Sequence, residues 1–362
     1  MSHGSHKLSA RLEPLDPHHI RPDTGARCEV SVFARTYPGP CWPFGMAQPG
    51  PDNITGWDYT NGYSWDLRYI EGFSMMRMSG VGWFGDFGNF QVMPTTGPLQ
   101  TYRGICLNRH GEGSTNGWHS EFFHRDETIL PGCYAVLLHR YNIRAELTAT
   151  RHCGMMRFTF PQHDLSRVQI DLARRIGGTS SQQEVRVVGD SAIEGWMRCG
   201  PEGGGMGNGA PKDLKYTVYF HAEFSQPLDA CGVWEVHFPD GLKRDREFIE
   251  SAEYADYCRN AAVHPGRKQA RGQHLGFYTE FPTEKNHQVL LKVGLSFVDL
   301  AGARNNLRTE LDHWDFDRVR RELAEQWGRE LSGLHVKTAS EHDKSVAATA
   351  VYHTRLDPRR ID

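Results

Sequence analysis

The sequence predicts a mainly β fold, a large antiparallel β-sandwich followed by helices. Between about residues 101 and 298, apolar and polar residues alternate in many short runs, and Gly, Pro, Asn or Asp residues separate these runs. After Asp299 the apolar residues recur every three or four positions, which is the period of an α-helix. This change of period predicts that the sandwich ends near residue 300 and that a helical segment begins there.

Residues 143–150 are the clearest predicted strand, because small or apolar residues alternate strictly with polar ones. Such alternation buries one face of a strand and leaves the other in water. Runs of the same kind recur as "GCYAVLLH", "MMRFTF", "RVQIDLA", "YTVYFHAEF", "VWEVHF" and "QVLLKVGLSFV". Many short strands with turn residues between them are typical of an antiparallel sandwich, which we assign to residues 30–300.

Residues 301–334 predict linker helices. Five apolar residues at spacings of 3, 4, 4 and 4 form one stripe of an amphipathic helix: Phe316, Val319, Leu323, Trp327 and Leu331. Asp315 can cap the start of this helix and Gly333 its end. We expect the stripe to lie against the sandwich, because an apolar helical face needs a partner that covers it.

The last segment, residues 335–362, carries a second helical pattern. Val346, Ala350 and His353 lie near one face of this helix, and Pro358 ends it. The apolar residues Val346, Ala350 and Val351 would need further helices to cover them. We therefore expect an exposed apolar patch on this helix.

Charge and cysteine usage narrow the class of partner. The chain of 362 residues has 41 Lys and Arg against 44 Asp and Glu, a formal net charge of −3, without a run of like charges. We therefore expect neither nucleic acid nor a membrane surface as a partner. The 8 cysteines form no C-x-x-C pair and no zinc-finger spacing with His. We expect Cys106, Cys133 and Cys231 to be free buried thiols.

The N-terminal residues show no export signal. Residues 1–23 contain no apolar stretch long enough for a signal peptide, and no run of about 18 apolar residues occurs elsewhere. As written, we expect the chain to be neither exported by that route nor inserted in a membrane. Its cellular location stays open.

Residues 80–85, "GVGWFG", match the G-x-G-x-x-G pattern of dinucleotide-binding folds. That pattern binds a pyrophosphate only where a strand precedes the glycines and a helix follows them. Here glycine-spaced aromatic residues and Pro94 follow, which indicates strand and turn. Residues 100–111 also offer no acidic residue for a ribose. We therefore predict no nicotinamide or flavin site, and the glycines need another explanation.

Five longer blocks provide one. They are "TYPGPCWPFGMAQPGPD" from residue 36, "GYSWDLRYIEGFSMMRMSGVGWFGDFGNFQVMPTTG" from residue 62, "PGCYAVLL…IRAELTATRHCGMMRFTFP" from residue 131, "VGLSFVDLAGARNNLRTEL" from residue 293 and "AVYHTRLDP" from residue 350. In this order, over about residues 36–358, they resemble the front portion of glycoside hydrolase family 92, a family of calcium-dependent exo-α-mannosidases. The resemblance implies a β-sandwich joined by linker helices to an (α/α)6 barrel. Residues 335–362 would then hold the first helix of a truncated barrel, and residues 1–29 a divergent N-terminal segment.

The resemblance assigns the glycines to a loop that walls the sugar pocket where the sandwich meets the barrel. Gly82 lets the backbone approach a ligand closely, while Trp83 and Phe84 offer apolar faces to sugar C–H groups. Asp86 can accept hydrogen bonds from sugar hydroxyls. As alternatives, the two aromatic residues pack in the core and Asp86 caps a turn. Arg77 stands where the family usually has His.

Three further residues are candidates for the same pocket. His124 and Glu127, in "FFHRDETILPG", match a His…Glu pattern that the family carries before a Pro-Gly-Tyr-Tyr strand. They form either a hydrogen-bonded pair that fixes a loop or contacts to the sugar itself. His353 lies on the first barrel-type helix and can approach the pocket.

The resemblance also implies what this chain lacks. Inverting hydrolysis of a glycoside needs a carboxylic acid and a carboxylate base that lie about 6.5 to 9.5 Å apart. By resemblance both groups, and the oxygen ligands of Ca²⁺, come from the barrel of the full-length family. We therefore expect residues 1–362 to hold no catalytic carboxylate and no Ca²⁺ ligand, and to be inactive alone.

The expected ligands are mannose-containing glycans, with terminal α-1,2-linked mannose as the expected substrate of the full-length enzyme. Two other interpretations belong to different classes of protein. The sandwich can be a stand-alone carbohydrate-binding module with a lectin-like surface. It can also be a docking partner of a separately encoded catalytic barrel. The family is often periplasmic or secreted, in contrast to the lack of an export signal here.

Overall fold

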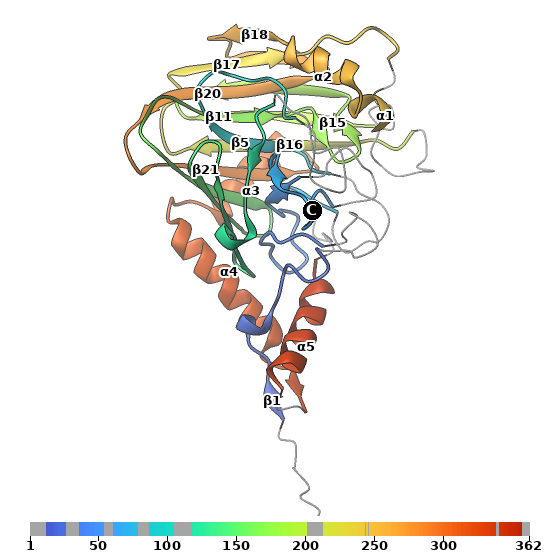
Figure 1. The fold of residues 1–362 in the computed structure, drawn as a ribbon, viewed down its shortest axis with the longest axis vertical. Coiled ribbons are helices and arrows are strands. Elements are labelled where there is room, and N and C mark those ends of the chain that lie inside the picture. The colour runs from blue at the N-terminus through green and yellow to red at the C-terminus, as the bar shows by residue number, and fades with distance from the viewer. Residues whose placement is uncertain are drawn as a thin grey trace, which may run out of the picture.

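The alternating runs of the sequence form two antiparallel sheets that pack face to face (Figure 1). The computed structural model describes residues 12–26, 36–53, 61–78, 87–104, 117–200, 213–242, 244, 246–337 and 340–356. Every strand pair that these residues form is antiparallel. The predicted mainly β sandwich is therefore confirmed, and the described residues form no parallel dinucleotide-binding sheet.

The larger sheet has nine strands in the order β19-β14-β15-β16-β21-β10-β9-β8-β7. The predicted strand at residues 143–150 is its member β9 (Ile143–Ala149). The others are β7 (Thr128–Leu130), β8 (Cys133–Leu138), β10 (Cys153–Phe160), β14 (Gln182–Val188), β15 (Ala192–Cys199), β16 (Tyr216–Phe224), β19 (Gln269–Gly272) and β21 (His287–Ser296).

The smaller sheet has seven strands in the order β18-β17-β20-β11-β5-β4-β2. They are β2 (Gly50–Asp52), β4 (Gly72–Ser74), β5 (Gln91–Thr96), β11 (His163–Asp171), β17 (Ala230–Glu235), β18 (Ala262–Pro265) and β20 (Leu275–Thr283). Three short pairs complete the strands: β1 (Glu13–Pro14) with β22 (His335–Val336), β3 (Tyr69–Ile70) with β6 (Ser120–Glu121), and β12 (Arg174–Arg175) with β13 (Gly178–Thr179).

The core of the sandwich follows from the period of two. In β21, alternate residues are fully buried and belong to the core between the sheets: Val289, Leu291, Val293 and Leu295. In β16 the corresponding residues are Val218, Phe220, Ala222 and Phe224. The intervening residues lie on the outer face of the nine-stranded sheet, and helices cover part of that face.

Two short helices lie beside the seven-stranded sheet, α1 (Arg246–Ile249) and α2 (Ala252–Arg259) (Figure 1). Ser251 caps α2, because its Oγ accepts a hydrogen bond from the Tyr254 N–H at 3.1 Å. Ile249, Tyr254 and Cys258 form a small apolar cluster that holds both helices to the sandwich.

Helix α3 (Leu300–Glu310) packs closely on the outer face of the nine-stranded sheet. A Cβ atom on Gly294 of β21 would lie 2.3 Å from the Ala303 carbonyl oxygen, so only glycine allows this approach. Glu194 of β15 is fully buried, and its carboxylate accepts hydrogen bonds from Arg304 Nε at 2.6 Å and from Arg186 Nε at 2.8 Å. The paired guanidinium groups hold the pKa of the Glu194 carboxyl at about 2 despite its burial.

Helix α4 (Phe316–Leu331) buries all five residues of the predicted stripe. Asp315 caps it as predicted, because its carboxylate accepts a hydrogen bond from the Arg318 N–H at 2.9 Å. Its first turns pack on the sheet through Phe316 and Val319. The helix ends at Leu331, Ser332 is its C-cap residue, and Gly333 follows outside the helix.

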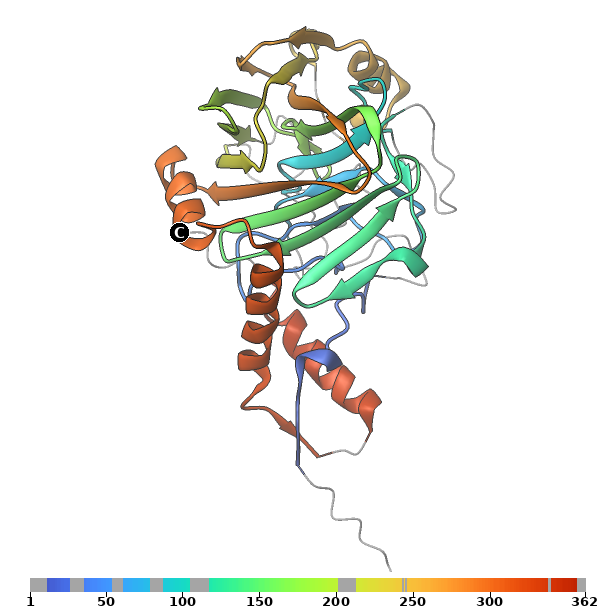
Figure 2. The ribbon, with the colours of Figure 1, turned by 90° about the vertical axis from the view of Figure 1, so that its left-hand side faces the viewer.

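The second half of α4 does not lie against the sandwich alone, so that expectation needs correction. Leu323, Trp327 and Leu331 share a cluster with Tyr352 of α5 (Glu341–His353) and with Ile20, which follows the single turn η1 (Pro17–His19). We call α4, α5, η1, β1 and β22 the stem. The stem projects from the sandwich along the long axis of the molecule (Figures 1 and 2).

The expected exposed patch on α5 is confirmed for two of its three residues. Val346 is 55% exposed and Ala350 is also exposed. Val351 is half-buried, because it packs against the apolar cluster of the stem. Helix α5 therefore has one face in the stem and one face open.

Cysteine chemistry agrees with the prediction where the structure describes it. Cys133 and Cys231 are buried free thiols, whereas Cys106 lies outside the described residues. Among the helices that the structure describes, none has the length and apolar character needed to cross a bilayer.

The Glu194 pair generates a testable prediction. Glu194→Gln should lower the free energy of unfolding by about 2 kcal/mol at pH 7, because it weakens the charge-assisted hydrogen bonds that two arginines donate to a buried group. The Glu194 pKa is lowered in the folded state, so its stabilisation is present above about pH 4.5 and is lost as the pH falls towards 2. Urea unfolding between pH 2 and 7 measures both effects.

The control is Glu322→Gln, which removes an exposed carboxylate that pairs with Arg318 on the same helix. We expect it to change the free energy of unfolding by less than about 0.5 kcal/mol. If Glu194→Gln is as stable as this control at pH 7, the contact of Glu194 with Arg304 does not anchor α3.

Candidate functional site

The predicted sugar-binding residues fall into two groups. Gly82, Trp83, Phe84 and Asp86 lie in residues 79–86, which are outside the described residues, so their roles stay predictions. His124, Glu127 and His353 are described. The described part of the candidate site begins at Arg77 and Phe87, which lie on either side of residues 79–86.

The chain segments before and after residues 79–86 are bonded to each other. Arg77 and Phe87 form an antiparallel bridge, and the Gly88 N–H donates to the Met76 carbonyl oxygen at 2.9 Å. The Phe87 carbonyl oxygen accepts from the Ile176 N–H at 2.9 Å. These contacts tie the chain on either side of the predicted sugar loop to the sandwich.

A buried ion pair lies at this bridge. Arg77 NH2 lies 2.7 Å from Asp52 Oδ1, and neither side chain is exposed to water. Asp52 also accepts from Ser74 Oγ at 3.0 Å and Gln91 Nε2 at 2.9 Å. Burial raises the pKa of Asp52, and these three donors oppose that rise. Breaking a buried pair of this kind costs about 3 to 5 kcal/mol, so the pair stabilises the chain that flanks residues 79–86.

The predicted His124 and Glu127 meet as a pair. His124 begins the single turn η2 (His124–Asp126), and Glu127 follows that turn. His124 Nδ1 lies 2.5 Å from Glu127 Oε2. The Glu127 carboxylate is 1% exposed and accepts further hydrogen bonds from Tyr134 OH at 2.5 Å and Tyr63 OH at 3.3 Å. The Glu127 hydrogen bonds raise the pKa of His124, although burial opposes the rise. The geometry favours a pair that positions the segment.

His124 nevertheless borders an open groove. Its ring stacks on Trp65 at a centroid distance of 3.7 Å, and its Nε2 lies 2.8 Å from the Trp65 carbonyl oxygen. The groove has a volume of about 490 Å³, and Asp66, Arg68 and Phe122 also line it. A stacked ring pair beside a carboxylate and a guanidinium can bind a small polar ligand.

His353 lies on a different groove, of about 640 Å³, between α5 and the N-terminal segment. Arg21 lines the opposite side, and its backbone N–H donates to Thr349 Oγ1 at 2.9 Å. The His353 Nε2 atom is buried and has no hydrogen-bond partner among the described residues, and burial lowers the pKa of this imidazole. The open face of α5, with Val346, forms one wall.

The two grooves share no lining residue, so the structure does not bring His353 into the pair of His124 and Glu127. One segment nevertheless connects them. Thr24 lines the His353 groove, and two residues later the Ala26 carbonyl oxygen accepts from the Trp65 N–H at 3.0 Å. Both grooves therefore border the segment that joins the sandwich to the stem.

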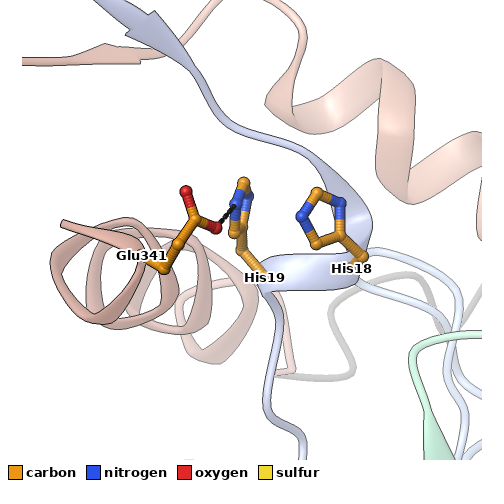
Figure 3. A group of neighbouring side chains, drawn as sticks. All are labelled: His18, His19 and Glu341. Carbon is orange, nitrogen blue, oxygen red and sulfur yellow. Dashed lines mark hydrogen bonds and ion pairs between the residues drawn. The ribbon is translucent and has the colours of Figure 1, made fainter. Parts of the chain in front are cut away.

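One group of described residues has the spacing of a metal site. Ligand atoms of His18, His19 and Glu341 lie within 4.8 Å of one another. Figure 3 shows Glu341 on α5 reaching across to His19, with His18 beyond it on the same turn. His19 Nε2 lies 3.1 Å from Glu341 Oε2.

The hydrogen bonds of this group do not fit a metal ion. His19 Nδ1 accepts from the Asp16 N–H at 3.1 Å, so the proton of the neutral ring lies on Nε2 and is donated to Glu341. A metal-bound imidazole has the opposite arrangement, in which the second nitrogen donates. Ca²⁺ also takes oxygen ligands, and two of these three groups are imidazoles. The group instead docks the N-terminal turn on α5.

Sequence analysis missed several of these neighbours. Asp52 and Arg77 are far apart in sequence, and no local pattern indicates that they pair. Trp65 and Tyr134 lie inside the blocks that resemble the family. No local pattern places Trp65 beside His124 or Tyr134 beside Glu127.

Two protein-family models match this chain, one over the sandwich and one over the helical segment. The model of the glycosyl hydrolase family 92 N-terminal domain matches residues 21–296, and that of the family 92 catalytic domain matches residues 302–362. A curated relative, an uncharacterized secreted glycosidase of Arthroderma benhamiae, is 24% identical over 340 residues, which are 89% of this chain and 40% of the relative.

Solved structures agree. A family GH92 α-mannosidase from Bacteroides thetaiotaomicron matches with a TM-score of 0.76 and 27% identity, over 94% of this chain and 41% of that chain. An inverting GH92 mannosidase from Bacteroides thetaiotaomicron VPI-5482 matches with a TM-score of 0.71 and 19% identity, over 96% of this chain and 40% of that chain, which shows the fold alone. The chain thus spans about 40% of the length of the relatives it matches.

The Glu127 network generates the second prediction. Glu127→Gln should lower the free energy of unfolding by about 2 to 3 kcal/mol, because a buried carboxylate that accepts from three donors is replaced by a group with its own donors. The pKa of His124 should fall. Since that pKa is raised in the folded state, the stabilisation is present below about pH 6.5 and is lost as the pH rises through the folded value.

An NMR titration of the His124 ring and urea unfolding measure the two effects. Glu121→Gln is the control, because Glu121 is an exposed neighbour whose carboxylate accepts a hydrogen bond from the Tyr69 hydroxyl at 3.4 Å. An unchanged His124 titration in Glu127→Gln would contradict the assigned pair.

Proposed function

Because the chain belongs to glycosyl hydrolase family 92, we propose that it forms the sandwich side of an α-mannosidase and walls part of the mannose pocket. The observation that carries the proposal is the junction between sandwich and stem. Arg77 and Phe87, which flank residues 79–86, are bridged, Arg77 is paired with buried Asp52, and two grooves border the segment that leads into the stem. Of the predicted sugar-binding residues that the structure describes, His124 lines one of these grooves and His353 the other.

In this proposal each residue has a limited role. Trp83 and Phe84 cover the apolar face of a terminal mannose, and Asp86 accepts hydrogen bonds from its hydroxyls. Gly82 allows close approach of the backbone. His124 meets the ligand only through the side of its ring that borders the groove, because Glu127 and the Trp65 carbonyl occupy its nitrogens.

The chemistry itself would come from the remainder of the catalytic domain, of which residues 302–362 match the beginning. An inverting reaction uses one carboxylic acid to protonate the leaving oxygen and one carboxylate to activate water. We assign both groups, the Ca²⁺ ligands and the preference for α-1,2 linkages to that remainder. The family GH92 α-mannosidase of Bacteroides thetaiotaomicron, which is 27% identical to this chain, supports this class of substrate.

Mannose binding tests the proposal. Methyl α-mannoside should bind the chain with a dissociation constant in the millimolar range, because losing about 4 kcal/mol of contacts weakens a micromolar site about a thousandfold. NMR of the indole signals measures the binding. Trp83→Ala and Asp86→Ala should abolish it, whereas Trp314→Ala, which removes an exposed indole elsewhere, should not.

Two results would contradict the proposal. One is mannoside binding that persists in both loop variants. The other is saturable micromolar binding of NAD that depends on Gly80 and Gly82, which would restore the dinucleotide interpretation of the same glycines.

A further inference from the structure

A third groove lies on the outer face of the nine-stranded sheet, over β14, β15, β16 and β19. Further along the same face, α3 contacts β21 and β16, and α4 contacts β9 and β10. The groove has a volume of about 560 Å³, which is sufficient for a small ligand of one or two sugar rings. We propose that it binds a carbohydrate that carries a carboxylate or a phosphate group.

Aromatic side chains form the floor and one end of the groove. Trp196 and Tyr219 are cross-strand partners on β15 and β16, and both are half-buried. Tyr216 and Phe297 form the end, with ring centroids 6.0 Å apart. Half-buried rings on a wet sheet face offer apolar surface to the C–H groups of a sugar and, through the tyrosine hydroxyls, hydrogen bonds to its oxygens.

Arg271 is held in position for an anion. Its guanidinium carbon lies 5.2 Å from the centre of the Trp196 ring, and its NH2 donates to Gln182 Oε1 at 3.4 Å. A guanidinium that stacks on an aromatic ring keeps the N–H groups of its edge free to donate. A carboxylate or phosphate oxygen matches that edge better than a neutral hydroxyl does, because charge-assisted hydrogen bonds are the stronger ones.

Two more cations border the groove. Arg198 and Lys215 are exposed, and neither forms an ion pair with a carboxylate of the described residues. Glu184 is the one acidic cross-strand neighbour of both Trp196 and Arg271 among the described residues, so the cations remain in excess.

Cations elsewhere on the same sheet face are paired. Arg186 and Arg304 bind Glu194, and Lys292 lies 3.0 Å from Glu223. The excess positive charge is therefore a property of this groove and not of the whole face. The proposal does not depend on mannosidase activity, since this groove shares no lining residue with the grooves of His124 and His353.

A matched series of ligands tests the proposal on the chain of residues 1–362. Glucose, glucuronate and glucose 6-phosphate share one ring and differ in charge, and inorganic phosphate lacks the ring. The indole N–H signal of Trp196 in NMR spectra, assigned with Trp196→Phe, reports binding. We expect glucuronate, glucose 6-phosphate or both to bind at least about 10-fold more tightly than glucose, which a single charge-assisted contact can supply.

Variants locate the site. Arg271→Gln and Lys215→Gln should each weaken binding of the anionic sugar about 10-fold. Both side chains are exposed, so folding should be unaffected. Arg308→Gln is the matched control, because it removes an exposed arginine of α3 that does not line the groove, and it should leave binding unchanged.

Three outcomes would overturn the proposal. Equal binding of glucose and the anionic sugars would remove the role of charge. Inorganic phosphate that binds as tightly as glucose 6-phosphate would remove the role of the ring. No binding, or binding that is insensitive to Arg271→Gln and Lys215→Gln, would show that this groove is not the binding site.

Discussion

The burial of Trp327 between the sandwich, α5 and the N-terminal segment is the contact on which the placement of the stem depends. Its ring lies 4.6 Å from that of Tyr352, and its Nε1–H donates to the Cys41 carbonyl oxygen at 3.0 Å. Since the first turns of α4 are already packed on the sheet through Phe316 and Val319, the same helix carries this contact outwards from the sandwich. A large buried ring with its polar atom satisfied is worth several kcal/mol, about 3 to 5 on replacement by alanine.

The two grooves of the candidate site follow from that placement. Because α5 is fixed by its buried face, its open face lies opposite Arg21 and Thr24 and forms the His353 groove. The same N-terminal segment continues to Ala26, which bonds Trp65 of the His124 groove. A change in how α4 leaves the sheet would therefore move one wall of one groove relative to the other.

The sequence alone allowed the strands, the stripe of α4 and its cap at Asp315 to be predicted, because each depends on local period or a single capping residue. It did not allow the partner of each apolar face to be predicted. A period identifies a buried face, but it does not say that Trp327 meets Tyr352 while Phe316 meets the sheet. The same limit applies to Asp52 with Arg77 and to His19 with Glu341, whose contacts join distant parts of the chain.

The candidate site was predicted less completely than the fold. Family resemblance pointed to His124 and Glu127, and geometry adds that Glu127 is enclosed by tyrosine hydroxyls and is not open to a substrate. The one metal-like group of the described residues, His18, His19 and Glu341, could not be predicted, because Glu341 lies more than 300 residues after the two histidines in the sequence.

Release of mannose from α-1,2-mannobiose in the presence of Ca²⁺ tests this central claim most directly. The account predicts that residues 1–362 alone release no mannose above the buffer blank, because we propose that the acid and the base come from the remainder of the catalytic domain. Turnover by this chain that is lost when one of its own carboxylates is replaced, for example in Asp86→Asn or Glu341→Gln, would contradict it.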